Sequence, residues 1–135
     1  MISRRTILHT LAGITLTASN LPAFGKSSRS SALQMLDTDH DGSVDLAEAK
    51  KAASMLFDRL DRDHEGTLDK RELAGRLSAK ELAAADTDHD GTLTKDEYLA
   101  VVEQRFNAAN RDGDSTLDAK ELNTKAGRSL LRLLR

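Results

Sequence analysis

The chain has 135 residues, of which 39% are hydrophobic, 31% are charged and 3% are aromatic, and its formal net charge is -2. It contains no cysteine, which excludes a disulfide scaffold and a thiolate metal site. Of its 22 acidic residues, 19 lie in four segments of twelve residues, and this concentration of acid excludes a basic protein that binds nucleic acid.

Residues 1–25 differ from the rest of the chain and predict an export signal. Arg4 and Arg5 precede a moderately apolar run, and Ala23 and Gly25 supply the small residues of a cleavage site. The run SRRTILH is similar to the twin-arginine signal pattern, and an ordinary secretory signal is the alternative. The apolar run is too short and too polar for a stable membrane span. The sequence therefore predicts a periplasmic or secreted protein with no membrane span after removal of the signal.

The predicted mature domain, 26–135, contains four repeats of one twelve-residue pattern. They read DTDHDGSVDLAE at 37–48 (loop 1), DRDHEGTLDKRE at 61–72 (loop 2), DTDHDGTLTKDE at 86–97 (loop 3) and NRDGDSTLDAKE at 110–121 (loop 4). Each fits, with small departures, the EF-hand loop D-x-[DN]-x-[DN]-G-x₅-E. This loop surrounds a hard cation with oxygens from positions 1, 3, 5, 7 and 9 and closes the site with a bidentate Glu at position 12. Four matches in register predict four sites for Ca²⁺ or trivalent lanthanide ions.

The predicted ligands occupy the same six positions in every loop, with the backbone carbonyl serving at position 7. They are Asp37, Asp39, Asp41, Ser43, Asp45 and Glu48 in loop 1; Asp61, Asp63, Glu65, Thr67, Asp69 and Glu72 in loop 2; Asp86, Asp88, Asp90, Thr92, Thr94 and Glu97 in loop 3; and Asn110, Asp112, Asp114, Thr116, Asp118 and Glu121 in loop 4. Glu65 is longer than the usual Asp or Asn and is expected to crowd the ion. Loop 4 is expected to be the weakest site, because Asn110 is neutral and Ser115 stands where glycine is favoured, at a cost of about 1 kcal/mol.

Three histidines share position 4 of the first three loops. They are His40, His64 and His89. A side chain at this position is expected to point into solvent. A pH-dependent role or a role in binding a transition metal remains the alternative.

The spacing of apolar residues predicts an all-α fold, a compact bundle of EF-hand repeats with the metal loops at helix ends. A helix is expected over 46–60, with its apolar face formed by Ala49, Ala53, Leu56, Phe57 and Leu60, and a second over 95–109, with Leu99, Val102, Phe106 and Ala109. Between loops 2 and 3, Ser78 and Glu81 form a capping box that separates two short helices. Near the end of the chain, Leu130, Leu131, Leu133 and Leu134 predict an apolar helix.

The tight loop spacing constrains which loops can pair. Successive loops start 24, 25 and 24 residues apart, so only 12 or 13 residues separate them. A helix of about fifteen residues is ~22 Å long, so the loops at its two ends cannot touch. We therefore expect loop 2 to pair with loop 3 and loop 1 to pair with loop 4.

These features resemble the lanmodulin family of periplasmic, lanthanide-binding EF-hand proteins. The resemblance runs from about residue 32 to the end, and rests on the short linkers, on Asn110 opening loop 4, on the run KDEYLA at 95–100 and on Gly127 before the leucine-rich tail. It also includes acids at position 9, namely Asp45, Asp69 and Asp118. The chain departs from the family at position 2, where Thr38, Arg62, Thr87 and Arg111 replace the characteristic proline. The resemblance implies the fold, a periplasmic location and lanthanide binding.

The predicted function is metal binding coupled to compaction, for buffering, uptake or delivery of the ion. Unscreened repulsion among the loop carboxylates is expected to favour an open chain until metal binds. The alternatives are a calcium sensor and a dockerin-like module for calcium-dependent protein interaction. An enzyme is not expected, because each clustered carboxylate has a ligand role. The protein is expected to be a monomer, and the sequence indicates no particular protein partner.

Overall fold

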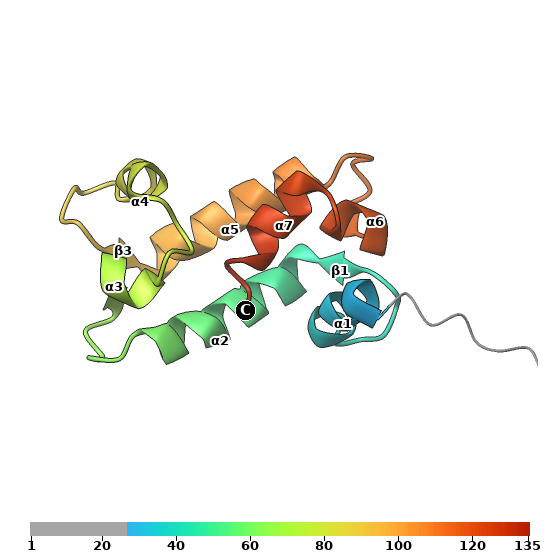
Figure 1. The fold of residues 1–135 in the computed structure, drawn as a ribbon, viewed down its shortest axis with the longest axis horizontal. Coiled ribbons are helices and arrows are strands. Elements are labelled where there is room, and N and C mark those ends of the chain that lie inside the picture. Colours follow the sequence, from blue (N-terminus) through green and yellow to red (C-terminus); the bar gives the residue numbers. More distant parts are fainter. Residues whose placement is uncertain (1–26) are drawn as a thin grey trace, which may run out of the picture.

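The computed structural model describes residues 27–135, which form seven helices and four two-residue strands (Figure 1). The elements are α1 Ser27–Leu36, β1 Val44–Asp45, α2 Leu46–Leu60, β2 Thr67–Leu68, α3 Lys70–Leu73, α4 Ala79–Ala85, β3 Leu93–Thr94, α5 Lys95–Ala109, β4 Thr116–Leu117, α6 Ala119–Leu122 and α7 Lys125–Leu131. The predicted export signal, 1–25, lies outside the described residues. Within 27–135, no helix is both long enough and apolar enough to cross a membrane.

The two long helices, α2 and α5, pack against each other along the middle of the molecule, and α7 packs on α5 (Figure 1). Both helices have the bounds that the sequence predicted. The ring of Phe57 meets the ring of Tyr98 edge to face, with centroids 5.7 Å apart. Tyr98 is fully buried, whereas Leu60 and Leu99, which the sequence placed on the core faces, are only partly buried at its margin. The core face of α5 therefore begins one residue earlier than predicted.

The loops pair through two antiparallel two-strand ladders. β1 pairs with β4, so that Val44 lies opposite Leu117, and β2 pairs with β3, so that Leu68 lies opposite Leu93. All four of these side chains are fully buried, so each ladder also closes an end of the apolar core. The pairing of loop 1 with loop 4 and of loop 2 with loop 3 is confirmed, and Figure 1 shows one pair at each end of the long helices.

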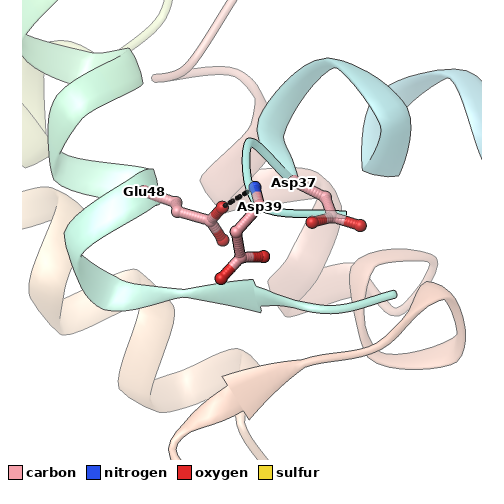
Figure 2. Close-up of side chains that lie close together, drawn as sticks. All are labelled: Asp37, Asp39 and Glu48. Carbon is pink, nitrogen blue, oxygen red and sulfur yellow. Dashed lines mark hydrogen bonds between the residues drawn. The ribbon is translucent and has the colours of Figure 1, made fainter. Parts of the chain in front are cut away.

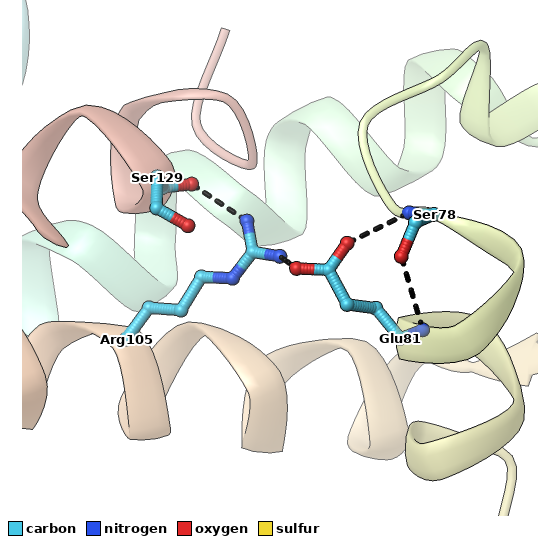
Figure 3. A network of polar contacts seen from close by, with 4 residues as sticks. All are labelled: Ser78, Glu81, Arg105 and Ser129. Atoms are coloured by element: carbon cyan, nitrogen blue, oxygen red, sulfur yellow. Dashed lines mark hydrogen bonds and ion pairs between the residues drawn. The ribbon is translucent and has the colours of Figure 1, made fainter. Parts of the chain in front are cut away.

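A polar network joins the turn before α4 to α5 and α7 (Figure 3). Ser78 caps α4: its hydroxyl accepts from the Glu81 amide at 3.2 Å, and the Glu81 carboxylate accepts from the Ser78 amide at 2.7 Å. The Arg105 guanidinium donates to Glu81 Oε1 at 2.7 Å and to the Ser129 carbonyl at 2.6 Å. Hydrogen bonds from Ser78, together with the charge of Arg105, hold the pKa of Glu81 below its usual range. The predicted capping box is confirmed, and Arg105 fixes its position against the core.

The C-terminal region differs from the predicted leucine helix. α7 begins after the cap Thr124 and ends at Leu131, so Leu133 and Leu134 lie beyond it. Their amides bond to carbonyls three residues back, Leu133 to Leu130 at 2.8 Å and Leu134 to Leu131 at 3.2 Å. The prediction of a helix through Leu134 was therefore wrong at its end. This tighter turn buries both leucines, and the carbonyl of Leu133 accepts a hydrogen bond from Tyr98.

The helix α1, Ser27–Leu36, leads directly into loop 1 and was not anticipated from the sequence. It places Ala32 and Leu36 in the core. The amide of Asp37 bonds to the carbonyl of Leu33 at 2.8 Å, which continues the helical bonding into the first position of the loop. Loop 1 is therefore preceded by a helix and followed by one, α2.

Candidate metal centre

Three clusters of carboxylates lie at the ends of the helices, one in each of loops 1, 2 and 3. Each joins positions 1, 3 and 12 of its loop: Asp37, Asp39 and Glu48; Asp61, Asp63 and Glu72; and Asp86, Asp88 and Glu97. In each cluster one oxygen from every residue lies within 4.8 Å of the others. Figure 2 shows the three side chains of loop 1 gathered beside the start of α2. An all-oxygen, anionic donor set of this kind fits a hard cation such as Ca²⁺ or a lanthanide.

The aspartate at position 1 is nearly buried and is held by the backbone of its own loop. Asp37 is 6% exposed, and its two oxygens accept from the amides of Asp41 at 3.1 Å and Gly42 at 2.9 Å. Burial raises the pKa of Asp37, but these hydrogen bonds outweigh burial and the pKa lies below its usual value. Gly42 reaches this geometry with a φ of 91°, in the region that favours glycine. The carboxylate at position 1 is therefore ionised and is oriented by its own loop.

The aspartate at position 3 has the opposite electrostatic environment. The amide of Asp41 favours ionised Asp39, but burial and the neighbouring negative charges outweigh this bond and raise the pKa of Asp39. The pKa of Asp88 in loop 3 is raised as well, first by its hydrogen bond with Asp86 and then by burial. A cation placed among these carboxylates would relieve the repulsion, so the charge pattern also fits metal binding.

The glutamate at position 12 is held by position 2, a contact that the sequence analysis missed. Glu48 Oε1 accepts from the amide of Thr38 at 2.6 Å and from its hydroxyl at 2.9 Å. Thr87 makes the same two bonds to Glu97, at 3.0 Å and 2.6 Å. In loops 2 and 4 an arginine occupies position 2, and its backbone amide alone donates to the glutamate. The recurrence of threonine at position 2 of loops 1 and 3 was the signal that could have revealed this role.

The position 5 side chains lie outside the three clusters, and the aspartates at this position bond within their loops. Asp41 Oδ1 accepts from the amide and hydroxyl of Ser43 at 2.9 Å and 2.8 Å. Asp90 with Thr92, and Asp114 with Thr116, repeat this pair of bonds. Among the hydrogen bonds of the described residues, none joins Thr67 to Glu65. The longer side chain of Glu65 thus sets loop 2 apart from the other three.

The position 9 side chains serve first as helix caps. Asp45, Asp69, Thr94 and Asp118 each precede a helix and accept a hydrogen bond from the amide of the position 12 glutamate, which in turn accepts from the position 9 amide. In loop 1 these two bonds measure 2.7 Å and 3.0 Å. The structure therefore places the position 9 oxygens at the helix N-terminus and outside the carboxylate clusters. From there they orient the glutamate at position 12.

Loop 4 holds its position 12 glutamate as the other loops do, but it carries less charge. The Glu121 carboxylate accepts hydrogen bonds from the backbone amides of Arg111 at 2.8 Å and Asp118 at 3.2 Å. The position 12 glutamates of the other loops accept from the same two positions. Asn110 is neutral, and among the described residues no cluster of three carboxylates forms in this loop. Ser115 has a φ of 75° where the other loops have glycine, so the expected strain is present.

The three loop histidines are exposed and lie outside the clusters. His40, His64 and His89 have φ values of 61°, 59° and 59°, a left-handed conformation at position 4 of each loop. None of them belongs to a carboxylate cluster. Their exposure agrees with the predicted solvent-facing position.

Comparison with known protein families agrees with this geometry. The family model described as EF hand matches residues 30–51, 53–74 and 79–102, which contain loops 1, 2 and 3. The chain therefore belongs to the EF-hand family, a calcium-binding family whose members are typically not enzymes. A search of curated proteins found no match. The protein is thus an EF-hand metal-binding protein, with three acidic loops that can hold calcium-like ions.

Proposed function

We propose that this protein is an exported metal binder that takes up Ca²⁺ or trivalent lanthanide ions in as many as four EF-hand loops and compacts as it does so. The observation that carries the proposal is the convergence of three carboxylates in each of loops 1, 2 and 3. Its role would be to buffer a metal ion outside the cytoplasm, to take it up or to deliver it. The resemblance to the lanmodulin family supports lanthanide as the ion.

The carboxylate count of the loops favours a trivalent ion. The predicted ligand positions hold five carboxylates in each of loops 1 and 2 and four in each of loops 3 and 4. These charges overcompensate a divalent cation, and Coulomb attraction grows with the charge of the ion. Ligand charge also tunes affinity among EF-hands. The same loops bind Ca²⁺ more weakly in this proposal.

Repulsion within the loops supports binding coupled to compaction. The raised pKa of Asp39, caused by burial and adjacent carboxylates despite an opposing backbone bond, reflects this repulsion. A bound cation cancels the repulsion among the carboxylates in the closed state. Because the open chain has no preformed site for the cation, binding stabilises the closed state. The two strand ladders then transmit closure from one loop to its partner.

Loop 4 is proposed as a fourth, weaker site. Its position 12 glutamate and its caps match those of the other loops. Asn110 supplies an oxygen without charge, and its Oδ1 accepts from the Gly113 amide at 3.0 Å. Loop 4 therefore fills last, after its partner loop 1 has bound metal and ordered the β1–β4 ladder.

The decisive experiment is a competitive titration with La³⁺ and Ca²⁺, followed by circular dichroism and by Tb³⁺ luminescence. Helix content is expected to rise at micromolar or lower La³⁺ and to need more Ca²⁺. Tyr98 follows ligand Glu97 directly and is the only tyrosine, so it serves as the sensitiser for Tb³⁺. Weak responses of equal size to both ions would refute lanthanide selectivity, and no response to either would refute the proposal.

Export by residues 1–25 is tested separately. Fusion of this segment to a reporter is expected to send the reporter to the periplasm. Replacement of Arg4 and Arg5 by lysine is expected to block export if the twin-arginine route is used and to have little effect on an ordinary secretory signal. A reporter retained in the cytoplasm with the unaltered segment would refute export.

A calcium sensor is the second candidate, and the exposed methionines favour it. Met35 and Met55 are 70% and 60% exposed, and such side chains suit adaptable protein contacts. A sensor opens on binding Ca²⁺ and exposes apolar surface, so the fluorescence of the dye ANS would rise with Ca²⁺. A metal buffer that compacts would instead lower the ANS signal.

A further inference from the structure

A second charged site, opposite in sign to the loops, lies where the turn after α3 meets the end of the chain. An open hollow of about 330 Å³ is lined by Arg76, Arg132, Arg135, Ala74 and Gly75. Three of the five lining residues are arginines, and no acidic residue lines the hollow. We call this site the arginine hollow.

No side-chain carboxylate within the described part of the chain forms an ion pair with the three arginines of the hollow. The ion pairs among residues 27–135 join Lys50 to Glu103, Lys95 to Asp58 and Arg105 to Glu81, and none of them involves the hollow. Arg105 adds a further positive charge nearby. Its pKa is lowered mainly by burial and also by the charge of Arg132, although Glu81 acts in the opposite direction. Arg105 is paired with Glu81, whose pKa the charge of Arg132 also lowers, and Arg76 donates to the terminal backbone oxygen of Arg135.

The backbone holds the hollow open and limits how it can rearrange. Ala74 and Gly75 both have positive φ, 48° and 77°, and they turn the chain sharply after α3. The hydrogen bond from Tyr98 to the Leu133 carbonyl anchors the segment between Arg132 and Arg135. The arginines therefore come from two segments that are each tied to the core, one by its turn and one by a buried phenol.

Arg76 retains unused hydrogen-bonding capacity. Its Nη1 and Nη2 make long bonds to the carbonyls of Leu73 at 3.5 Å and Arg135 at 3.2 Å. Its Nε is buried and has no hydrogen-bond partner. A buried polar atom without a partner is costly, so a shift of Arg76 that brings an acceptor to this nitrogen would be stabilising.

We propose that the arginine hollow binds a phosphate-type oxyanion, either as free phosphate or as the headgroup of an anionic phospholipid. The planar guanidinium group matches two oxygens of a phosphate at once, and it keeps its charge at every physiological pH. Three such groups around one hollow suit a compact anion with several oxygens. This site is separate from the metal loops and does not depend on which ion they bind.

The first arm of the test uses inorganic phosphate and the full chain loaded with Ca²⁺, so that the closed state in which the hollow forms is populated. The amides of Gly75, Arg76 and Leu133 are followed by ¹H–¹⁵N NMR, with sodium chloride at equal ionic strength as the reference. Saturable shifts at these amides are expected. Replacement of both Arg132 and Arg135 by glutamine should weaken binding about tenfold or more, since a charged hydrogen bond contributes ~1.5 kcal/mol or more.

The matched control is Arg59→Gln, an exposed arginine in the last turn of α2 that lies outside the hollow. It is expected to leave phosphate binding unchanged. Arg76→Gln is measured alongside, with circular dichroism to check folding. Because Arg132 and Arg135 are both exposed, their variant retains the fold and the test remains decisive even if Arg76→Gln does not fold.

The second arm uses sedimentation with vesicles of phosphatidylglycerol, compared with phosphatidylcholine. Binding to phosphatidylglycerol alone, lost in the double variant and retained in Arg59→Gln, would identify a lipid headgroup as the source of the phosphate. Shifts with inorganic phosphate would identify the free anion. The proposal is overturned if neither probe binds, or if Arg59→Gln loses as much binding as the hollow variants.

Discussion

The phenol of Tyr98 donates a 2.8 Å hydrogen bond to the backbone carbonyl of Leu133, 35 residues further along the chain. Tyr98 directly follows Glu97, the last predicted ligand of loop 3, and is fully buried. Leu133 is fully buried as well and lies just beyond α7. One buried bond therefore fastens the end of the chain to the first turn of the helix that follows loop 3.

Tyr98→Phe tests the contribution of this bond. The substitution keeps the ring contact with Phe57 and leaves the Leu133 carbonyl buried without its partner, so the free energy of unfolding should fall by about 1–2 kcal/mol. Urea denaturation at saturating Ca²⁺, followed by circular dichroism, measures the change. An unchanged midpoint would mean that water replaces the phenol at no cost.

The same tyrosine predicts a dependence of stability on pH. Burial raises the pKa of Tyr98 to about 12, above its ordinary value of 10.0. The folded state therefore keeps the proton that the unfolded state releases, so the contribution of Tyr98 is complete below pH 10 and is lost as the pH rises toward 12. The difference in melting temperature between the parent protein and Tyr98→Phe should shrink over this window. A constant difference would contradict the raised pKa.

Ser115→Gly is expected to strengthen loop 4. Ser115 has a φ of 75°, and the corresponding residues of the other loops are glycines with φ between 82° and 91°. Removing the side chain relieves about 1 kcal/mol of backbone strain, which should raise both stability and the affinity of loop 4 for metal. Calorimetric titration with La³⁺ measures the affinity. Ser115→Ala is the control and should give no gain; equal gains from both would exclude strain as the cause.

Glu97→Gln is expected to weaken metal binding in loop 3. The change removes one charge from a cluster of three carboxylates and should lower affinity on the order of a hundredfold. The Gly91 amide, which bonds to Asp86 at 2.8 Å, reports on loop 3 by NMR, and the Gly42 amide reports on loop 1. Glu103→Gln lies outside the loops and serves as control. A Gly91 titration that matches the parent protein would rule out Glu97 as a ligand.

Gly127→Ala is expected to disturb loop 4 from outside it. A Cβ atom at Gly127 would lie 2.2 Å from the Glu121 carbonyl oxygen and 2.6 Å from the backbone of Leu122. Helix α7 must then move away from α6, at a cost of about 2–3 kcal/mol, and Glu121 moves with it. Thermal unfolding and La³⁺ titration detect the two effects. Lys125→Ala, an exposed site on the same helix, should show neither; an unchanged Gly127→Ala would indicate that α7 packs loosely.

Local patterns in the sequence were sufficient for much of the fold. The capping box at Ser78 and the bounds of α2 and α5 follow from residues within one or two turns, so they could be predicted without the tertiary structure. The loop pairing followed from the length of a fifteen-residue helix, because a rigid rod keeps its two ends apart. Export by residues 1–25 stays a prediction, since that segment lies outside the described residues.

Contacts between distant residues could not be predicted in this way. Arg105 is not among the residues that the sequence placed on the apolar face of α5, yet it is 9% exposed because Glu81 and Ser129 come from two other helices to meet it. The predicted C-terminal helix extended too far for a related reason. Tyr98 donates a hydrogen bond to the Leu133 carbonyl, and no local pattern near Leu133 predicts that partner.

The sequence by itself determined the chemistry of this protein, because metal ligation in an EF-hand depends on oxygens at set positions within twelve residues. It could place 19 carboxylates in four loops before any contact was known. The structure added which of these carboxylates converge within each loop and which cap helices, and only the tertiary structure brought three arginines from two separate segments around one hollow. The hollow depends on packing between segments far apart in the chain, where burial and charge are decided by neighbours that the local sequence does not contain.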